Sequence, residues 1–185
     1  MVEETTEMKA VIFDTETTGL IINPARKLDA QPEIVSIAVL SVELDIPRME
    51  DLYYKMFKPI RPIAADAIKI HGITNEYVKD MPSIEMELPF LIPKLRSGDL
   101  IIGQNVRFDM DMVEFECRRY NTPPPRWPRA LDLVENSIFL KGFRLSLSNL
   151  HMELFGMQFE GAHKADTDVQ ITAKCAIEMR RRGWL

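Results

Sequence analysis

A short apolar run that ends in two acidic residues, two positions apart, is the feature that most constrains this chain. The run Val11-Ile12-Phe13 is followed by Asp14-Thr15-Glu16 and then by the turn-forming residues Thr17-Thr18-Gly19. Apolar and β-branched residues in such a run predict a buried strand. Alternate side chains of a strand point to the same face of a sheet, so both carboxylates would project together. The fold must therefore accommodate two like charges at one strand end.

This pair of carboxylates predicts a metal site. Two negative charges on one sheet face repel each other unless a cation lies between them. Oxygen ligands without an accompanying cluster of Cys or His suit Mg²⁺ or Mn²⁺ better than structural zinc. A solvated strand end would carry the same two acids, so the spacing alone leaves both interpretations open.

The hydrophobic pattern predicts an α/β fold with a mixed five-stranded sheet. We expect strands at residues 9–16, 34–42 and 52–57, forming an antiparallel meander, and two shorter strands at 100–103 and 130–134. Strands first and strand–helix alternation afterwards favour helices on both faces of the sheet. Helices are expected at 64–70, 75–79, 83–96, 108–120, 145–155 and 167–182.

Two pairs of residues predict where helices break or begin. Pro89 and Pro93 fall inside the helix expected at 83–96 and should break or kink it. Thr167 and Gln170 have the spacing of a capping box, which predicts that the last helix begins beside Thr167.

Length and composition indicate one soluble domain, residues 1–185, whose first eight residues are expected to be flexible. The chain has 185 residues, of which 46% are hydrophobic and 28% are charged, as in globular proteins. It lacks a run of roughly 20 uncharged apolar residues that could span a membrane. The segment 1–7 is acidic, unlike the start of a signal peptide. We therefore expect a cytoplasmic protein without membrane contact, in which Cys117 and Cys175 are buried thiols.

The net charge of −5 argues against a protein that holds long nucleic acid by its overall charge. It does not exclude a nuclease. A site built from several carboxylates is neutralised only when its metal ions are bound, and a substrate held at one end needs only local cations.

Further acidic residues occur at two other predicted helix starts. Asp109 begins the helix that follows the fourth strand, and Asp168 lies in the first turn of the last helix, just after His163. A loop His and a first-turn Asp can face one cavity, where the His accepts a proton from water and the Asp holds a metal. Taken singly, such residues are more often a surface His and a helix-dipole partner.

Together, these residues fall in blocks that resemble the histidine variant of the DEDD exonuclease superfamily, the DnaQ-like exonucleases. Within that family the resemblance is to the epsilon proofreading subunits of bacterial DNA polymerase III and their stand-alone relatives. The blocks follow the family's order over nearly the whole chain, and they read FDTETTG at 13–19, IHGIT at 70–74, GQNVRFD at 103–109 and HKADTD at 163–168.

The resemblance implies a ribonuclease-H-like fold and a metal-dependent 3′→5′ exonuclease. Such an enzyme removes nucleoside 5′-monophosphates from the 3′ end of single-stranded DNA or of frayed ends, in proofreading or repair. It uses two divalent metal ions, Mg²⁺ or Mn²⁺, to stabilise the attacking and leaving oxygens. By resemblance, Asp14 would bridge both ions, Glu16 and Asp168 would complete one of them, Asp109 would support the second, and His163 would be the general base.

Substrate contacts also follow from the resemblance. The donors at the 3′ end would be Thr17 and Thr18, and Asp66 would contact the terminal sugar. Three residues would surround the terminal base, namely Ile70, His71 and Phe108. Stacking of a base on a side-chain ring tolerates any sequence, as an enzyme that degrades any end requires.

Two acids compete with these assignments. Asp111 lies two residues after Asp109, but two steps along a helix turn a side chain away from the site. Asp166 lies two residues before Asp168, and the family's spacing from His163 favours Asp168. Asp166 is then expected to be a helix cap or a nearby solvated charge.

Alternative functions remain at this stage. An exoribonuclease of the same family is one, because none of the blocks reads a 2′-hydroxyl. A non-catalytic nucleic-acid-binding module on the same fold would lack a metal ligand or the base, and none is missing. A haloacid-dehalogenase-type phosphatase would carry Asp in place of Glu16.

The end of the chain bears on its partners. The chain ends about one helix after Asp168, where an epsilon subunit continues into the segment that docks on its polymerase. We therefore expect a stand-alone or phage-type exonuclease, or an excised catalytic domain, that binds the 3′ end of nucleic acid. A DNA polymerase remains an alternative partner, although its docking segment is not evident.

Overall fold

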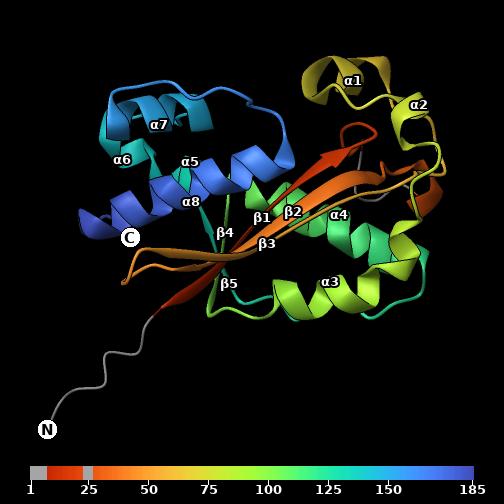
Figure 1. Ribbon diagram of the computed structural model, residues 1–185, viewed down its shortest axis with the longest axis horizontal. Helices are drawn as coiled ribbons and strands as arrows, with labels where there is room; N and C mark the ends of the chain where they lie inside the picture. Colours follow the sequence, from red (N-terminus) through yellow and green to blue (C-terminus); the bar gives the residue numbers. More distant parts are fainter. Residues whose placement is uncertain (1–7, 23–26) are drawn as a thin grey trace, which may run out of the picture.

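The fold is a mixed five-stranded sheet with helices on both faces, as the sequence predicted (Figure 1). This computed structural model describes residues 8–22 and 27–185. The strands lie in the order β3-β2-β1-β4-β5. β1, β2 and β3 form the expected antiparallel meander, and β4 and β5 add in parallel to β1. The strand bounds are Lys9–Thr17 for β1, Ile34–Glu43 for β2, Arg48–Met56 for β3, Leu100–Gly103 for β4 and Arg129–Asp132 for β5.

β1 lies in the centre of the sheet because its apolar residues face two cores. Ala10 and Ile12 belong to the core that contains residues of α7 and α8, whereas Val11 and Phe13 belong to the core that contains residues of α3 and α4. A strand covered on both faces needs such a continuous apolar run. The helices span Ala65–His71 (α1), Asn75–Val78 (α2), Leu88–Leu95 (α3), Val106–Arg119 (α4), Leu133–Asn136 (α5), Ile138–Lys141 (α6), Leu147–Phe155 (α7) and Ala165–Arg181 (α8).

The helix expected at 83–96 is divided, as its prolines predicted. A 3₁₀ turn, Ile84–Met86, precedes α3, and Pro89 occupies the first turn of α3. Proline is tolerated there because the first N–H groups of a helix have no intrahelical partner. Pro93 remains inside α3.

Two local predictions were wrong. The strand expected at 130–134 ends at Asp132, because the Asp132 side chain accepts a hydrogen bond from the Val134 N–H and caps α5 instead. The capping box at Thr167 does not form, since α8 already begins at Ala165, and its N-cap, Lys164, makes no side-chain capping bond. α5 and α6 were not predicted either.

Most of the segment expected to be flexible, 1–8, falls outside the described residues; Met8 donates its backbone N–H to Asp45 Oδ2 at 3.1 Å. Cys117 and Cys175 are free and buried, as expected. Within 8–22 and 27–185, no helix has the length and apolar character needed to cross a membrane.

Candidate active site

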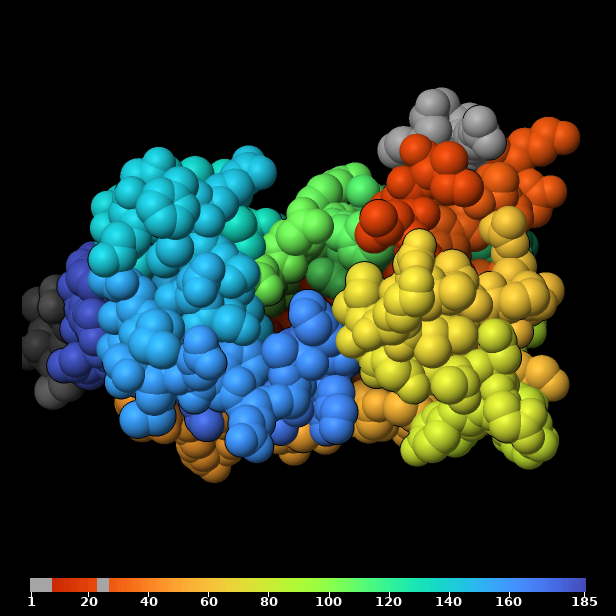
Figure 2. Space-filling view, turned by 90° about the horizontal axis from the view of Figure 1, so that it is seen from above, coloured from red at the N-terminus to blue at the C-terminus, as the bar shows by residue number. Residues whose placement is uncertain are grey.

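Three of the predicted metal ligands meet where β1 ends and α8 begins. Carboxylate oxygens of Asp14, Glu16 and Asp168 all lie within 4.8 Å of one another. Figure 1 shows the end of β1 between α1 and the first turn of α8. Figure 2 shows the surface hollowed between the blue segment that leads into α8 and the yellow α1. Strand alternation and the helix start thus bring Asp14 and Glu16 together with Asp168, which lies far along the sequence, into one half-buried group.

Asp109 lies deeper, in the first turn of α4, and is 3% exposed. Its Oδ1 accepts hydrogen bonds from the backbone N–H of Thr15 at 2.9 Å and from the Thr15 hydroxyl at 2.6 Å. Because Thr15 separates the two acids of β1, Asp109 fixes the end of that strand. Asp111 instead forms an ion pair with Arg107 at 2.6 Å on the outer side of the helix, in agreement with the preference for Asp109.

The turn between β4 and α4 explains how Asp109 comes to this position. A Cβ on Gly103 would lie 2.9 Å from the Cβ of Val106, so glycine is required there. Asn105 has a φ of 54°, a left-handed conformation that Asn tolerates, and its N–H donates to Asp132 Oδ1 at 3.2 Å. The negative charge of Asp132 contributes to raising the pKa of Asp109. Sequence reasoning missed Asp132, although it is an acid at a strand end, as Asp14 is.

The pKa values of these acids show a site with too much negative charge for its burial. Burial, followed by the charges of Asp109, Glu16 and Asp168, raises the pKa of Asp14 well above its usual value. Burial and the Asp168 charge raise the pKa of Glu16 to about 8. Burial raises the pKa of Asp109 to about 7 and also raises that of Asp168. A cation among these groups would remove the cause of the shifts.

The donor atoms fit a divalent cation. Asp168 Oδ1 is buried and has no hydrogen-bond partner among the described residues, whereas its Oδ2 accepts the backbone N–H of His163 at 3.0 Å. An unpaired buried carboxylate oxygen is costly unless a ligand satisfies it. Carboxylate oxygens are the ligands that Mg²⁺ and Mn²⁺ prefer.

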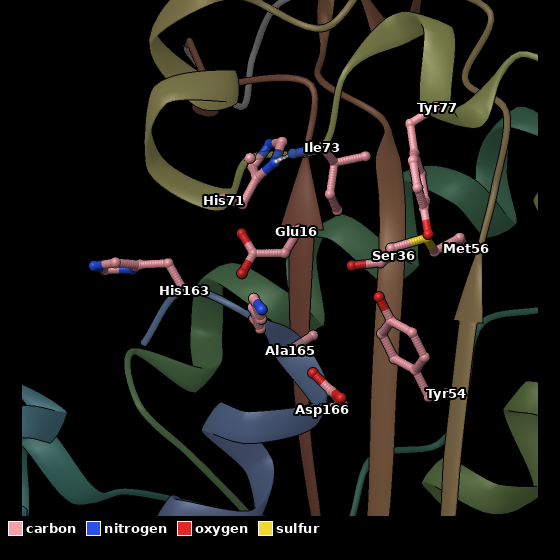
Figure 3. Close-up of a pocket in the computed structure, with 12 residues that line it drawn as sticks. Glu16, Ser36, Tyr54, Met56, His71, Ile73, Tyr77, His163, Ala165 and Asp166 are labelled. Carbon is pink, nitrogen blue, oxygen red and sulfur yellow. Dashed lines mark hydrogen bonds between the residues drawn. The ribbon is translucent and has the colours of Figure 1, made fainter. Parts of the chain in front are cut away.

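His163 is an exposed residue with strained backbone. Its φ of 65° is in the left-handed region, which His visits more often than most residues but which still costs free energy. The bond from its N–H to Asp168 anchors it beside the carboxylates. His163 lines the same pocket as Glu16, yet Figure 3 shows its ring pointing away from Glu16.

Three of the residues expected to contact the 3′ end of the substrate form hydrogen bonds within the protein. His71 is 8% exposed; its Nδ1 accepts the Ile73 N–H at 3.0 Å, and its Nε2 lies 3.2 Å from the Thr17 carbonyl oxygen. The Thr17 hydroxyl donates to the Gly19 carbonyl at 2.7 Å, and the Thr18 hydroxyl accepts the Glu33 N–H at 3.0 Å. These bonds fix the turn after β1 and hold α1 against it.

The other three predicted contact residues differ in burial. Ile70 is 59% exposed on α1 and is free to meet a ligand. Phe108 is half-buried and packs against the core under α4. Asp66 is exposed and pairs with Lys69 at 2.9 Å.

A cavity of about 310 Å³ opens beside Glu16 (Figure 3). Several of its lining residues were not singled out in the sequence, namely Ser36, Tyr54, Met56 and Tyr77. Asp166 also lines it and is not a helix cap, because α8 has no side-chain cap. The signal that could have found part of this lining is the period-2 spacing of Tyr54 and Met56 along β3.

We expect Glu16→Gln to stabilise the metal-free protein at high pH. With a folded pKa of about 8 and an ordinary value of 4.5, Glu16 supports the fold below pH 4.5 and loses this support as the pH rises to about 8. In EDTA, the Tm of the variant should exceed that of the unmutated protein by about 4 °C at pH 8.5 and match it at pH 4. Thermal unfolding measures this, with the exposed Glu85→Gln as control. An equal Tm difference at both pH values would contradict the assignment.

Comparison with known proteins identifies the family. Residues 11–176 match the family model RNase_T, described as Exonuclease. DNA polymerase III subunit epsilon of Pasteurella multocida (strain Pm70) is 31% identical over 117 residues, which is 61% of this chain and 43% of the relative. The PolC-type DNA polymerase III of Caldanaerobacter subterraneus subsp. tengcongensis is 27% identical over 96% of this chain and 12% of its own length. The chain thus spans less than half of these two relatives.

Solved structures share the fold. Exonuclease X in complex with 5′ overhanging duplex DNA superposes with a TM-score of 0.68 at 25% identity, covering 95% of this chain and 94% of that one. The nuclease domain of 3′hExo, a DEDDh family member bound to rAMP, gives a TM-score of 0.78 at 18% identity over 97% and 94%. The fold is therefore ribonuclease-H-like, as the resemblance implied. With a family match over residues 11–176 and the acidic group of β1 and α8 in place, the chain belongs to the RNase_T exonuclease family.

Proposed function

We propose that this protein is a two-metal-ion 3′→5′ exonuclease that removes nucleoside 5′-monophosphates from single-stranded DNA or frayed ends. The observation that carries the proposal is the convergence of Asp14, Glu16 and Asp168, with one buried carboxylate oxygen lacking a partner, in a chain of an exonuclease family. Residues 1–185 would act as one catalytic domain, in the cytoplasm.

Four carboxylates would hold the two ions. Asp14 would be the ligand shared by both ions; burial, followed by the charges of the other three acids, raises its pKa, which supports this central role. Glu16 and Asp168 would complete one ion, and Asp109 would support the second. Bound Mg²⁺ or Mn²⁺ would stabilise charge on the attacking and leaving oxygens of the phosphodiester.

His163 would be the general base. Its imidazole would accept the proton of the attacking water, while the bond from phosphorus to the O3′ of the preceding nucleotide breaks. The anchored backbone and exposed ring support this role, because the ring can turn toward the carboxylates. Catalytic hydrogen bonds often tighten only when substrate is present.

The 3′ end would lie against the turn after β1. Thr17 and Thr18 would contact the terminal sugar and hydroxyl, with Asp66 near that sugar. The exposed side chain of Ile70 supports a contact with the terminal base. His71 and Phe108 would complete the base site.

DNA is the substrate that we propose, with RNA as the second candidate. The exonuclease X structure contains duplex DNA, and 3′hExo contains rAMP, so relatives of both kinds share this fold. Relatives named as DNA polymerase III proteins favour DNA and a proofreading or repair role. They also make a DNA polymerase a candidate partner.

A competition between polymers tests the substrate. Single-stranded DNA and RNA of one sequence are incubated with the protein and Mg²⁺, and the products are separated by chromatography. We expect 5′-monophosphates, with DNA shortened at least about ten times faster than RNA. Faster shortening of RNA would contradict the choice of DNA, and products that carry 3′-phosphates would contradict the reaction.

A further inference from the structure

The pocket beside the carboxylates has a second side that the proposed chemistry does not use. At about 310 Å³ it is large enough for a small ligand, since such sites span roughly 300–1,000 Å³. Glu16 and His163 lie on one side, and Tyr54, Met56 and Tyr77 lie on the other (Figure 3). A ligand in this pocket would therefore border the reacting phosphate directly.

Two tyrosines make the far side aromatic. Tyr54, on β3, is 36% exposed and Tyr77, on α2, is 61% exposed. Figure 3 shows their hydroxyl groups approaching each other from opposite directions. The phenolic hydroxyl of Tyr54 can donate a hydrogen bond to a ligand. Exposed aromatic rings are the surface on which nucleic-acid bases stack.

A buried hydroxyl between the two sides points to a polar ligand. Ser36, on β2, is fully buried and lines the pocket, where its hydroxyl lies next to the Tyr54 side chain and makes no well-formed hydrogen bond in the part of the chain that the structure describes. A buried hydroxyl without a partner costs free energy that a polar ligand atom would recover. Lys164, an exposed residue of the same lining, adds a positive charge suited to a phosphate.

The lining of the pocket is largely distinct from the residues proposed for the terminal base. Ile70 and Phe108 do not line it, whereas His71 does and forms the wall that the two sites share. If the last phosphodiester of a DNA strand lies at Asp14 and its terminal base lies at Ile70, the rest of the DNA must extend away from these two residues. The aromatic pocket is the opening next to the carboxylates in which its next nucleotide can lie.

We propose that this pocket binds the base of the penultimate nucleotide, the one that becomes the new 3′ end. The base stacks on the Tyr77 ring, the more exposed of the two, and its polar edge meets the Ser36 hydroxyl. This inference rests on the proposed function. Binding of the penultimate base in this pocket makes the enzyme prefer the end of a polynucleotide over an ester of a single nucleotide, without preference for sequence.

Two substrates isolate this pocket. A DNA oligonucleotide has a penultimate base, whereas thymidine 5′-(p-nitrophenyl phosphate) has a terminal nucleoside and no nucleotide beyond the scissile bond. Tyr77→Ala should lower the ratio of kcat/KM for the oligonucleotide to kcat/KM for the ester by about tenfold, in the range measured when a base loses its aromatic stacking partner. Phe90→Ala, which removes an exposed ring on α3, should leave the ratio unchanged.

An abasic penultimate nucleotide supplies a second readout. It should slow the unmutated protein about tenfold and should have little further effect on Tyr77→Ala, because both changes remove one interaction. An unchanged ratio in Tyr77→Ala, or additive effects of the abasic nucleotide and the variant, would overturn the pocket assignment. If the unmutated protein hydrolyses neither substrate, the proposed function fails first and the pocket assignment with it.

Discussion

Asp14→Asn is expected to lower kcat for single-stranded DNA at least about 1,000-fold. Asn keeps the shape of the side chain but removes the negative charge that both ions would share, and metal ions stabilise the transition state by several kcal/mol, with each 1.36 kcal/mol giving a factor of ten. The measurement is the initial rate of shortening of a labelled oligonucleotide at saturating Mg²⁺.

Two controls separate lost chemistry from lost folding. Asp14→Asn should have at least the Tm of the unmutated protein in EDTA, because the substitution removes a carboxyl group whose pKa is raised by burial and by the neighbouring acids. Asp111→Asn removes an acid outside the carboxylate group, one that pairs with Arg107 on α4, and it should keep more than half of the activity. A residual rate above one tenth in Asp14→Asn would refute the role of Asp14.

His163→Asn is expected to lower kcat by about 100- to 10,000-fold, the contribution usual for a general base. Asn tolerates the left-handed backbone at this position and keeps the N–H that donates to Asp168, so the carboxylates should stay in place. Mn²⁺ affinity, measured by calorimetry, should therefore change less than threefold. The pH–rate profile should lose the rise that depends on a neutral imidazole.

A rescue experiment distinguishes base catalysis from a positional effect. Glycine also accepts a φ of 65°, so His163→Gly should fold and leave space for imidazole added to the solution. Added imidazole should raise the rate of His163→Gly at least about tenfold above its rate without imidazole. A loss of Mn²⁺ affinity that parallels the loss of kcat, without rescue, would assign His163 to metal binding instead.

The fold was largely predictable because its determinants are local in the sequence. The apolar run before Asp14 specifies a central strand, and the residues between Ile34 and Met56 specify two partners joined by a short turn. The short helices α5 and α6 were not predictable in this way. They depend on the capping bond from Val134 to Asp132, which competes with extension of β5.

The candidate site was predictable only in part. Strand alternation paired Asp14 with Glu16, whereas Asp109 and Asp168 were chosen through the family resemblance and now lie beside that pair. Tyr77 carried no signal, because it reaches the pocket from α2 only after the chain has folded, and Tyr54 carried only its period-2 spacing from Met56 along β3. Of the two interpretations given for Asp166, a helix cap or a nearby solvated charge, the cap is excluded because α8 begins at Ala165, two residues earlier than predicted.

Shortening of single-stranded DNA with a label at its 5′ end tests the central claim most directly. With Mg²⁺ or Mn²⁺, the labelled strand should shorten in single-nucleotide steps from its 3′ end, and the ladder should vanish in EDTA and in Asp14→Asn. Turnover that persists in EDTA, or immediate release of the label as a mononucleotide from the 5′ end, would contradict it.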